Sequence, residues 1–350
     1  MKVLHLNLPP VPPELARERL APLGAELVVA ESRDGDEVLE VARDVDAIIT
    51  AGIGRLLTEE LVGGLQRCRH VSIWSGSTDY LDLAPFTANR ICVSFAADAC
   101  TDEVADHGMA MMLALGRKLF HFDRVMRATK GVYVPHDPII DAAKPLPRLS
   151  TLTVGSIGFG RAGMALATRT TGFGMRFLAY DPFVPPGTGA ELGVELTTME
   201  RVLAESDFVH LYVPMKADTF HLVGADQLRQ MKPTAYLINS SARSTVIDEV
   251  ALLRALTDGT IAGAGLDNLD MPEGVTAEGV SPDEAAELTA NPILALDNVI
   301  LTPHIAHVSD DAYRTMQHRV CDDVVEFFGG RWPALVANPA VKELIGTPPG

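Results

Sequence analysis

Short apolar runs alternate with amphipathic stretches through the first hundred residues. The apolar runs are rich in Val, Ile and Leu, and they predict five strands, at 2–7, 26–30, 47–51, 71–75 and 92–95. Residues at helical spacing predict helices between these strands, at 14–23, 36–43 and 58–66. Strands that alternate with helices form parallel sheets covered on both faces. We therefore expect a small, flavodoxin-like, doubly wound α/β domain.

After residue 101 the spacing of the apolar residues becomes that of a long helix. From 102 to about 127, apolar positions such as Val104, Met111 and Leu115 recur near helical spacing, which predicts one long helix. The stretch 134–148 contains four prolines and predicts a linker or a surface arm.

A second series of apolar runs predicts six more strands, at 152–157, 176–180, 208–213, 235–239, 261–266 and 299–302. Six parallel strands separated by helical stretches predict a doubly wound Rossmann sheet. A last helix is expected at 310–328 and would pack back on the first sheet. We therefore expect one discontinuous domain, 1–100 plus 305–350, and a second domain, 101–304.

Composition excludes several classes of protein. The 350 residues include 29 Lys and Arg against 46 Asp and Glu, giving a net charge of −17, and 47% are hydrophobic. An acidic chain without a basic block is not expected to bind nucleic acid. No apolar run approaches the roughly 20 residues that span a bilayer, so no membrane association is expected. The cysteines Cys68, Cys92, Cys100 and Cys321 are dispersed, which favours buried thiols and a cytoplasmic location.

A glycine motif lies between the first strand of the second series and a helical stretch. Gly158, Gly160 and Gly163 have GxGxxG spacing, with Arg161 and Ala162 between the last two. The first glycine permits a tight turn, the second lets the backbone approach a pyrophosphate, and the third lets the helix pack close to the sheet. The helix N-terminus offers unpaired N–H groups to phosphates. The motif predicts a dinucleotide site.

Asp181 stands eighteen residues after Gly163, at the end of the next strand. A carboxylate there can bond both ribose hydroxyls and would repel a 2′-phosphate. The cofactor predicted from the sequence is therefore NAD rather than NADP.

Five segments resemble the D-isomer-specific 2-hydroxyacid dehydrogenase family. They are INSSAR at 238–243, GAGLD at 263–267, LTPHI at 301–305, SGSTDYLD at 75–82 and VADH at 104–107. The resemblance implies that 101–304 is an NAD-binding Rossmann domain and that 1–100 plus 305–350 binds substrate. It also implies a homodimer formed through the nucleotide domains.

The resemblance implies a role for individual residues as well. Arg243 would bind the substrate carboxylate and carbonyl, and His304 would be the general acid and base. The backbone N–H groups of Ser75, Gly76 and Ser77 would hold the other face of the carboxylate. The remaining residues would contact the cofactor, with Asp267 at the nicotinamide carboxamide; they are Val213, Pro214, Ser241 and Asp267.

The chemistry of a 2-oxo acid supports these roles independently. Reduction needs a proton for the carbonyl oxygen and a cation for the carboxylate. A histidine exchanges protons near neutral pH, and a guanidinium grips two oxygens at once. Arg243 and His304 follow predicted strand ends, where doubly wound sheets bind their ligands.

The sequence departs from the family pattern at two places. The family places a Glu that hydrogen-bonds the catalytic His five residues after the equivalent of Asp267, and here that position is Pro272. Glu273 follows directly, and we expect a local shift to bring it to His304 as a third catalytic group; the alternative is that Glu273 is solvated and His304 lacks a carboxylate partner. The segment 274–291 is longer than usual and is interpreted as a surface insertion.

The predicted function is NAD-dependent interconversion of a 2-oxo acid and a D-2-hydroxy acid. A phosphoglycerate-type or a formate- or phosphite-type dehydrogenase of the same fold remains an alternative, as does an NAD(H)-sensing protein without catalysis. His304 and His307 form HxxH without a third ligand, so no metal is expected. His107 is interpreted as a packing residue of the long helix.

Overall fold

Two units, each built on a parallel sheet, make up the part of the chain that the computed structural model describes, which is residues 1–350 except 9, 52–55, 131–144, 241–242, 270–290 and 350. The first unit comprises Met1–Cys100 and Val308–Gly350, and the second comprises Thr101–His307. The second crossing between units was expected after residue 304 and lies after His307.

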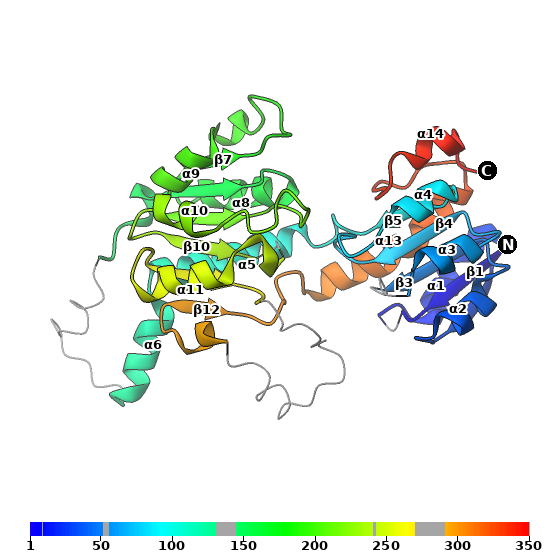
Figure 1. The fold of residues 1–350 in the computed structure, drawn as a ribbon, viewed down its shortest axis with the longest axis horizontal. Coiled ribbons are helices and arrows are strands. Elements are labelled where there is room, and N and C mark those ends of the chain that lie inside the picture. Colours follow the sequence, from blue (N-terminus) through cyan, green and yellow to red (C-terminus); the bar gives the residue numbers. More distant parts are fainter. Residues whose placement is uncertain (9, 52–55, 131–144, 241–242, 270–290, 350) are drawn as a thin grey trace. The chain divides into compact units, whose positions relative to one another are not determined.

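The first unit contains a five-stranded sheet with the order β2-β1-β3-β4-β5. Helix α13 comes from the far end of the sequence and packs against α1 and β4 (Figure 1). Its Val320, Cys321 and Val324 share a core with residues of β1 and β3. The strands are β1 (Lys2–Leu6), β2 (Glu26–Ala30), β3 (Ala47–Ala51), β4 (His70–Trp74) and β5 (Cys92–Phe95). The helices are α1 (Pro13–Leu20), α2 (Gly35–Ala42), α3 (Glu59–Gly64), α4 (Ala84–Ala88), α13 (Asp310–Phe328) and α14 (Val341–Ile345).

The second unit contains a seven-stranded sheet with the order β12-β11-β10-β9-β6-β7-β8. From β6 the chain first adds β7 and β8 on one side and then β9 to β12 on the other, so the topological switch point lies beside β6. The strands are β6 (Thr153–Ile157), β7 (Arg176–Tyr180), β8 (Val194–Leu196), β9 (Phe208–Leu211), β10 (Tyr236–Asn239), β11 (Gly263–Leu266) and β12 (Val299–Leu301). The helices are α5 (Thr101–Gly116), α6 (Leu119–Ala128), α8 (Arg161–Thr171), α9 (Met199–Glu205), α10 (Ala225–Gln230) and α11 (Glu249–Thr257). Short 3₁₀ turns complete the described elements: η1 (Ala21–Leu23), η2 (Leu149–Thr151), η3 (Ala190–Leu192), η4 (Ser244–Val246) and η5 (Pro292–Ala295).

The predicted fold class is confirmed, and the short helices α4 and α14 are elements that the sequence did not predict. Two further differences concern the second unit. The second sheet has a seventh strand, β8, at its edge. The long helix predicted from 102 to 127 is two helices, because Lys118 adopts a left-handed φ of 53° between α5 and α6. The predicted arm at 134–148 lies largely outside the described residues, as does the insertion at 274–291.

No helix in the described part of the chain combines the length and the apolar composition that crossing a bilayer requires. All four cysteines are buried thiols outside any disulfide, as the sequence predicts.

Candidate active site

The glycine turn follows β6 at the switch point of the second sheet. Gly158 has a φ of +93°, and a Cβ there would lie 2.3 Å from the carbonyl oxygen of Tyr212. A Cβ on Gly163 would lie 2.8 Å from the carbonyl oxygen of Gly158, so helix α8 packs directly on the turn. A Cβ on Gly160 would meet no heavy atom within 4 Å. The first and third glycines are therefore required by the fold, while the second leaves its space open.

Helix α8 begins without a side-chain cap. Gly160 is its N-cap residue, Arg161 opens its first turn, and no acidic residue lies in that turn. Ala162 is half-buried and the next residue, Gly163, is buried. The unpaired N–H groups of the first turn, together with the open space at Gly160, form a cradle for a pyrophosphate. The residues present therefore fit a dinucleotide.

The Asp181 carboxylate lies at the end of β7, the strand next to β6, and accepts hydrogen bonds from the backbone of two segments. Its Oδ2 accepts the N–H of Phe159 at 2.9 Å, and its Oδ1 accepts the N–H of Phe183 at 2.9 Å. Asp181 thus connects the end of β7 to the glycine turn. On the other side of β6, the chain continues from β9 into half-buried Val213 and exposed Pro214, whose carbonyl accepts the Thr219 hydroxyl at 2.7 Å.

Three neighbouring strands end at the same level of the sheet. Asn239 of β10 is in register with Leu266 of β11, which is in register with Leu301 of β12. The chain therefore leaves all three strands at one edge, toward Arg243, Asp267 and His304 respectively. At about 4.8 Å per strand, β11 lies roughly 14 Å from β6, and an extended dinucleotide can span that distance. The structure places these three predicted residues on one edge together with the glycine turn.

Asp267 binds the loop that carries His304. Its buried carboxylate accepts the Thr302 hydroxyl at 2.6 Å and the N–H groups of Ile305 and Ala306 at 2.9 Å each. His304 itself is exposed and has a φ of +55°, which is uncommon for a residue with a side chain. These bonds fix the loop in which His304 has this backbone conformation. Arg243 is also exposed and is the N-cap residue of η4.

His307 lies beside the candidate acid. The two imidazole rings meet edge to face with their centroids 5.3 Å apart. Burial lowers the pKa of His307, the nearby His304 lowers it further, and Asp267 acts in the opposite direction. His307 therefore tends to stay neutral beside His304.

The segment after β4 in the first unit, residues 75–77, forms hydrogen bonds with nearby residues of its own chain. The Ser75 N–H bonds the carbonyl of Ile73, and the Ser77 N–H bonds the Ser75 hydroxyl at 3.2 Å. A Cβ on Gly76 would lie 3.5 Å from Cys100 Sγ, which is an ordinary contact. Two of the three N–H groups assigned to the substrate carboxylate are thus engaged within the chain.

Two predicted site residues, Ser241 and Glu273, lie outside the described residues. Sequence reasoning missed Thr302 and treated His107 as a packing residue, although both contact Asp267. Their position beside a motif residue was the available signal: Thr302 lies two residues before His304, and His107 belongs to the VADH segment.

Comparison with known proteins agrees with this geometry. Residues 109–306 match the model described as D-isomer specific 2-hydroxyacid dehydrogenase, NAD binding domain. The chain is 35% identical over 317 residues to a glyoxylate reductase of Korarchaeum cryptofilum, covering 89% of this chain and 88% of that protein. It is 34% identical over 313 residues to a glyoxylate reductase of Pyrococcus furiosus, covering 88% and 87%.

Solved structures share the fold over nearly the whole chain. A D-lactate dehydrogenase of Aquifex aeolicus, complexed with NAD and lactic acid, has a TM-score of 0.76 at 28% identity and covers 93% of this chain and 95% of its own. An NADPH-dependent glyoxylate/hydroxypyruvate reductase of Sinorhizobium meliloti, in complex with NADP and malonate, has a TM-score of 0.75 at 28% identity and covers 97% of both chains.

Proposed function

Since the chain belongs to the D-isomer specific 2-hydroxyacid dehydrogenase family, we propose that the carboxyl edge of its second sheet is the active site of an NAD-dependent oxidoreductase that interconverts 2-oxo acids and D-2-hydroxy acids. The observation that carries the proposal is that β10, β11 and β12 end in register. The segments that follow these strands carry a guanidinium, a carboxylate and an imidazole on the edge of the sheet that also holds the glycine turn. Neither a phosphoglycerate-type reaction nor a sensor without catalysis is favoured by the relatives.

The glycine turn and the first turn of α8 hold the dinucleotide phosphates in this proposal, and Asp181 receives the adenosine ribose. Val213, Pro214, Ser241 and Asp267 complete the cofactor contacts. When bound there, NADH supplies the hydride that adds to the carbonyl carbon of the 2-oxo acid. A carboxylate at the ribose position supports NAD over NADP.

Arg243 binds the substrate carboxylate and polarises the carbonyl, because a guanidinium offers two parallel N–H donors to paired oxygens. The His304 imidazolium donates its proton to the carbonyl oxygen during reduction and recovers it during oxidation. Gly76 supplies a further backbone N–H to the carboxylate, while Ser75 and Ser77 would do the same only by releasing their N–H groups from Ile73 and from the Ser75 hydroxyl. Glu273 is retained in the proposal as the carboxylate partner of His304.

We further propose glyoxylate as a substrate, because the relatives at 35% and 34% identity are glyoxylate reductases. The test is loss of nicotinamide absorbance when purified protein is mixed with NADH or NADPH and with glyoxylate, pyruvate, hydroxypyruvate or phenylpyruvate. Turnover of glyoxylate with a preference for NADH is expected. NADH binding without turnover of any acid would contradict the enzyme assignment.

Two variants assign the roles of the catalytic residues. Arg243→Ala and His304→Ala are each expected to lower kcat/KM by at least about 100-fold, because each removes a group that binds the reacting oxygens. Both variants should bind NADH with wild-type affinity in calorimetry, since the phosphates rest on the glycine turn. Retained turnover in His304→Ala would remove His304 from the acid role.

The oligomer proposed for this chain is a homodimer formed through its second unit. The support is the apolar surface of α6, where Leu119, Phe120 and Met126 are 56%, 53% and 41% exposed. Large apolar side chains that are exposed on one helix are a feature of interaction surfaces. Sedimentation should give a dimer that Leu119→Glu with Phe120→Glu dissociates, and a wild-type monomer would contradict it. The four buried thiols, which form no disulfide, support the cytoplasm as the location, because they suit a reducing compartment.

A further inference from the structure

His107 of helix α5 contacts the loop that carries the proposed acid. Its Nε2 lies 2.9 Å from Thr302 Oγ1 and 3.6 Å from Asp267 Oδ1. The His107 side chain is 20% exposed, and that of Asp267 is 1% exposed. His107, Thr302 and Asp267 therefore form one contact chain at the loop that carries His304.

The number of protons on these groups decides which of them donate and which accept in this contact chain. Both Asp267 oxygens accept backbone N–H groups, so Asp267 acts as an acceptor. The Thr302 hydroxyl has a single proton, and its oxygen lies 2.6 Å from Asp267 Oδ1, a distance that requires a proton between them. Thr302 therefore donates to Asp267. Its oxygen can only accept from His107, which must carry a proton on Nε2.

We propose that His107 is a positioning residue for the reaction: its Nε2–H fixes the Thr302 hydroxyl on Asp267 and so holds in place the loop from Thr302 to Ala306, which carries the His304 imidazole. The inference rests on the proposed role of His304 as the acid.

The loop depends on this chain because its backbone has an uncommon conformation at the residue that carries the imidazole. His304 has a φ of +55°, and the two residues that follow it donate their N–H groups to Asp267. Three donors reach the Asp267 carboxylate from the loop, and one of them is the hydroxyl that His107 orients. Loss of the His107 donor frees Thr302 to rotate, and the imidazole two residues further on loses part of its fixed position. Reaction rates are sensitive to displacements of about 1 Å in such groups.

Substitution series at both positions test the proposal by activity. His107→Leu is expected to lower kcat for glyoxylate about tenfold while the KM and the NADH dissociation constant change less than about twofold. His107→Gln, which returns an N–H donor near the position of Nε2, should restore most of kcat. Thr302→Val should match His107→Leu, Thr302→Ser should stay near wild type, and the Leu/Val double variant should be no slower than either single variant.

His318 on α13, another half-buried helical histidine, provides the control. His318→Leu should leave kcat unchanged. Equal losses in His107→Leu and His107→Gln, or losses that multiply in the double variant, would overturn the proposal.

The protonated nitrogen can be observed without activity. In protein labelled with ¹⁵N-histidine, long-range ¹H–¹⁵N spectra at pH 8 should show a proton on Nε2 of His107, in a signal that His107→Gln removes. A proton on Nδ1 alone would overturn the proposal. If His304→Ala retains turnover, the proposed acid role of His304 fails instead, and the protonated nitrogen of His107 still reports on the contact chain.

Discussion

Gly158 and Gly160 lie two residues apart, and each position requires glycine for a different reason. Gly158 combines a φ of +93° with a close approach to the Tyr212 carbonyl, so its lack of a side chain is a requirement of the folded chain. Gly160 has an ordinary φ of −80° and open space where a Cβ would lie. Its lack of a side chain serves only a ligand that approaches the backbone.

The two glycines therefore predict different variants. Gly160→Ala should keep the wild-type unfolding temperature and weaken NADH binding by at least about tenfold, because the methyl group occupies the place of a phosphate oxygen. Gly158→Ala should lower the unfolding temperature as well, because of its backbone clash. Calorimetry for NADH and thermal unfolding followed by circular dichroism separate the two effects. Unchanged NADH affinity in Gly160→Ala would place the pyrophosphate elsewhere.

Asp323 of α13 is a buried carboxyl group in the first unit, remote in sequence from every proposed site residue. Burial raises its pKa to about 7; Glu326 and Asp98 add to the rise, while Ser94 and Arg319 oppose it. A raised pKa in the folded state means that the carboxyl stabilises the fold when protonated. This contribution is complete below the ordinary pKa of 3.8 and is lost as the pH rises toward 7.

Asp323→Asn should remove that pH dependence. Between pH 5 and pH 8 the wild type is expected to lose about 3 kcal/mol of stability through this group, because only the two pH units from 5 to the raised pKa of about 7 contribute, and the Asn variant should lose less. Urea unfolding at both pH values measures the difference. The same pH dependence in both proteins would show that Asp323 does not ionise in this range.

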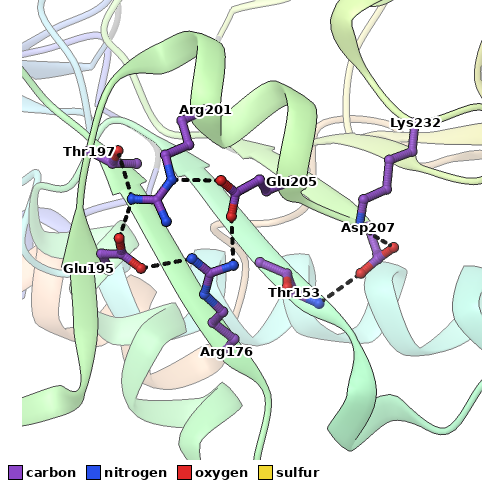
Figure 2. A network of polar contacts seen from close by, with 8 residues as sticks. All are labelled: Thr153, Arg176, Glu195, Thr197, Arg201, Glu205, Asp207 and Lys232. Atoms are coloured by element: carbon purple, nitrogen blue, oxygen red, sulfur yellow. Dashed lines mark hydrogen bonds and ion pairs between the residues drawn. The ribbon is translucent and has the colours of Figure 1, made fainter.

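At the scale of elements, four charged side chains tie β7, β8 and α9 together at the surface (Figure 2). Arg176 pairs with Glu195 at 2.8 Å and with Glu205 at 2.7 Å, and Arg201 pairs with the same two carboxylates. Each cation therefore contacts both anions in a closed ring. In a ring, each side chain that is fixed by one partner loses less freedom on meeting the other, so the pairs are expected to reinforce one another.

The ring predicts a small stabilisation that depends on salt. Arg176→Ala should lower the unfolding temperature by about 1–3 °C at low ionic strength, and by less in 1 M NaCl, because the partners are partly exposed. Arg229, which forms a single exposed pair with Asp226 on α10, is the matched control, and Arg229→Ala should change little. An effect of Arg176→Ala that is independent of salt would argue for packing rather than charge.

Element boundaries were predictable from the sequence where a periodic pattern was long enough. The strands at 26–30, 47–51, 92–95 and 176–180 and the last helix at 310–328 were predicted with their observed bounds. The edge strand β8 was missed because three residues do not establish a period. The break between α5 and α6 was missed because it depends on the backbone of Lys118 and on tertiary packing, where a Cβ on Gly116 would lie 2.8 Å from Phe208.

The sequence predicted the candidate-site residues that belong to recognisable motifs. The glycine turn, Asp181, Arg243 and His304 all stand beside strand ends, and the topology of the sheet brings them to one edge. His107 was not recognised, because its partner Thr302 is 195 residues away in the sequence. Only the folded chain reveals a contact of that range.

At the scale of the whole molecule, the second unit is continuous in sequence and the first is assembled from both ends. Asn338 joins the two segments of the first unit, because its side chain accepts the Val93 N–H and donates to the Ile91 carbonyl, each at 2.9 Å. The second unit contains the glycine turn and its own core.

A fragment of residues 101–307 should therefore fold and bind NADH without reducing glyoxylate. Circular dichroism and calorimetry measure folding and binding, and the same fragment with Gly160→Ala is the control that should not bind. A fragment that unfolds, or that reduces glyoxylate at the wild-type rate, would contradict the independence of the two units.

At His304, the side chain that the proposed reaction needs differs from the one that a left-handed backbone favours. Asn visits the left-handed region more readily than other residues with a side chain, because its short polar side chain can hydrogen-bond locally. Replacing the imidazole by an amide should therefore produce an inert enzyme that melts at a higher temperature than its parent, and calorimetric scans of His304→Asn beside the wild type would show it. The proton donor is retained at a permanent cost to the fold.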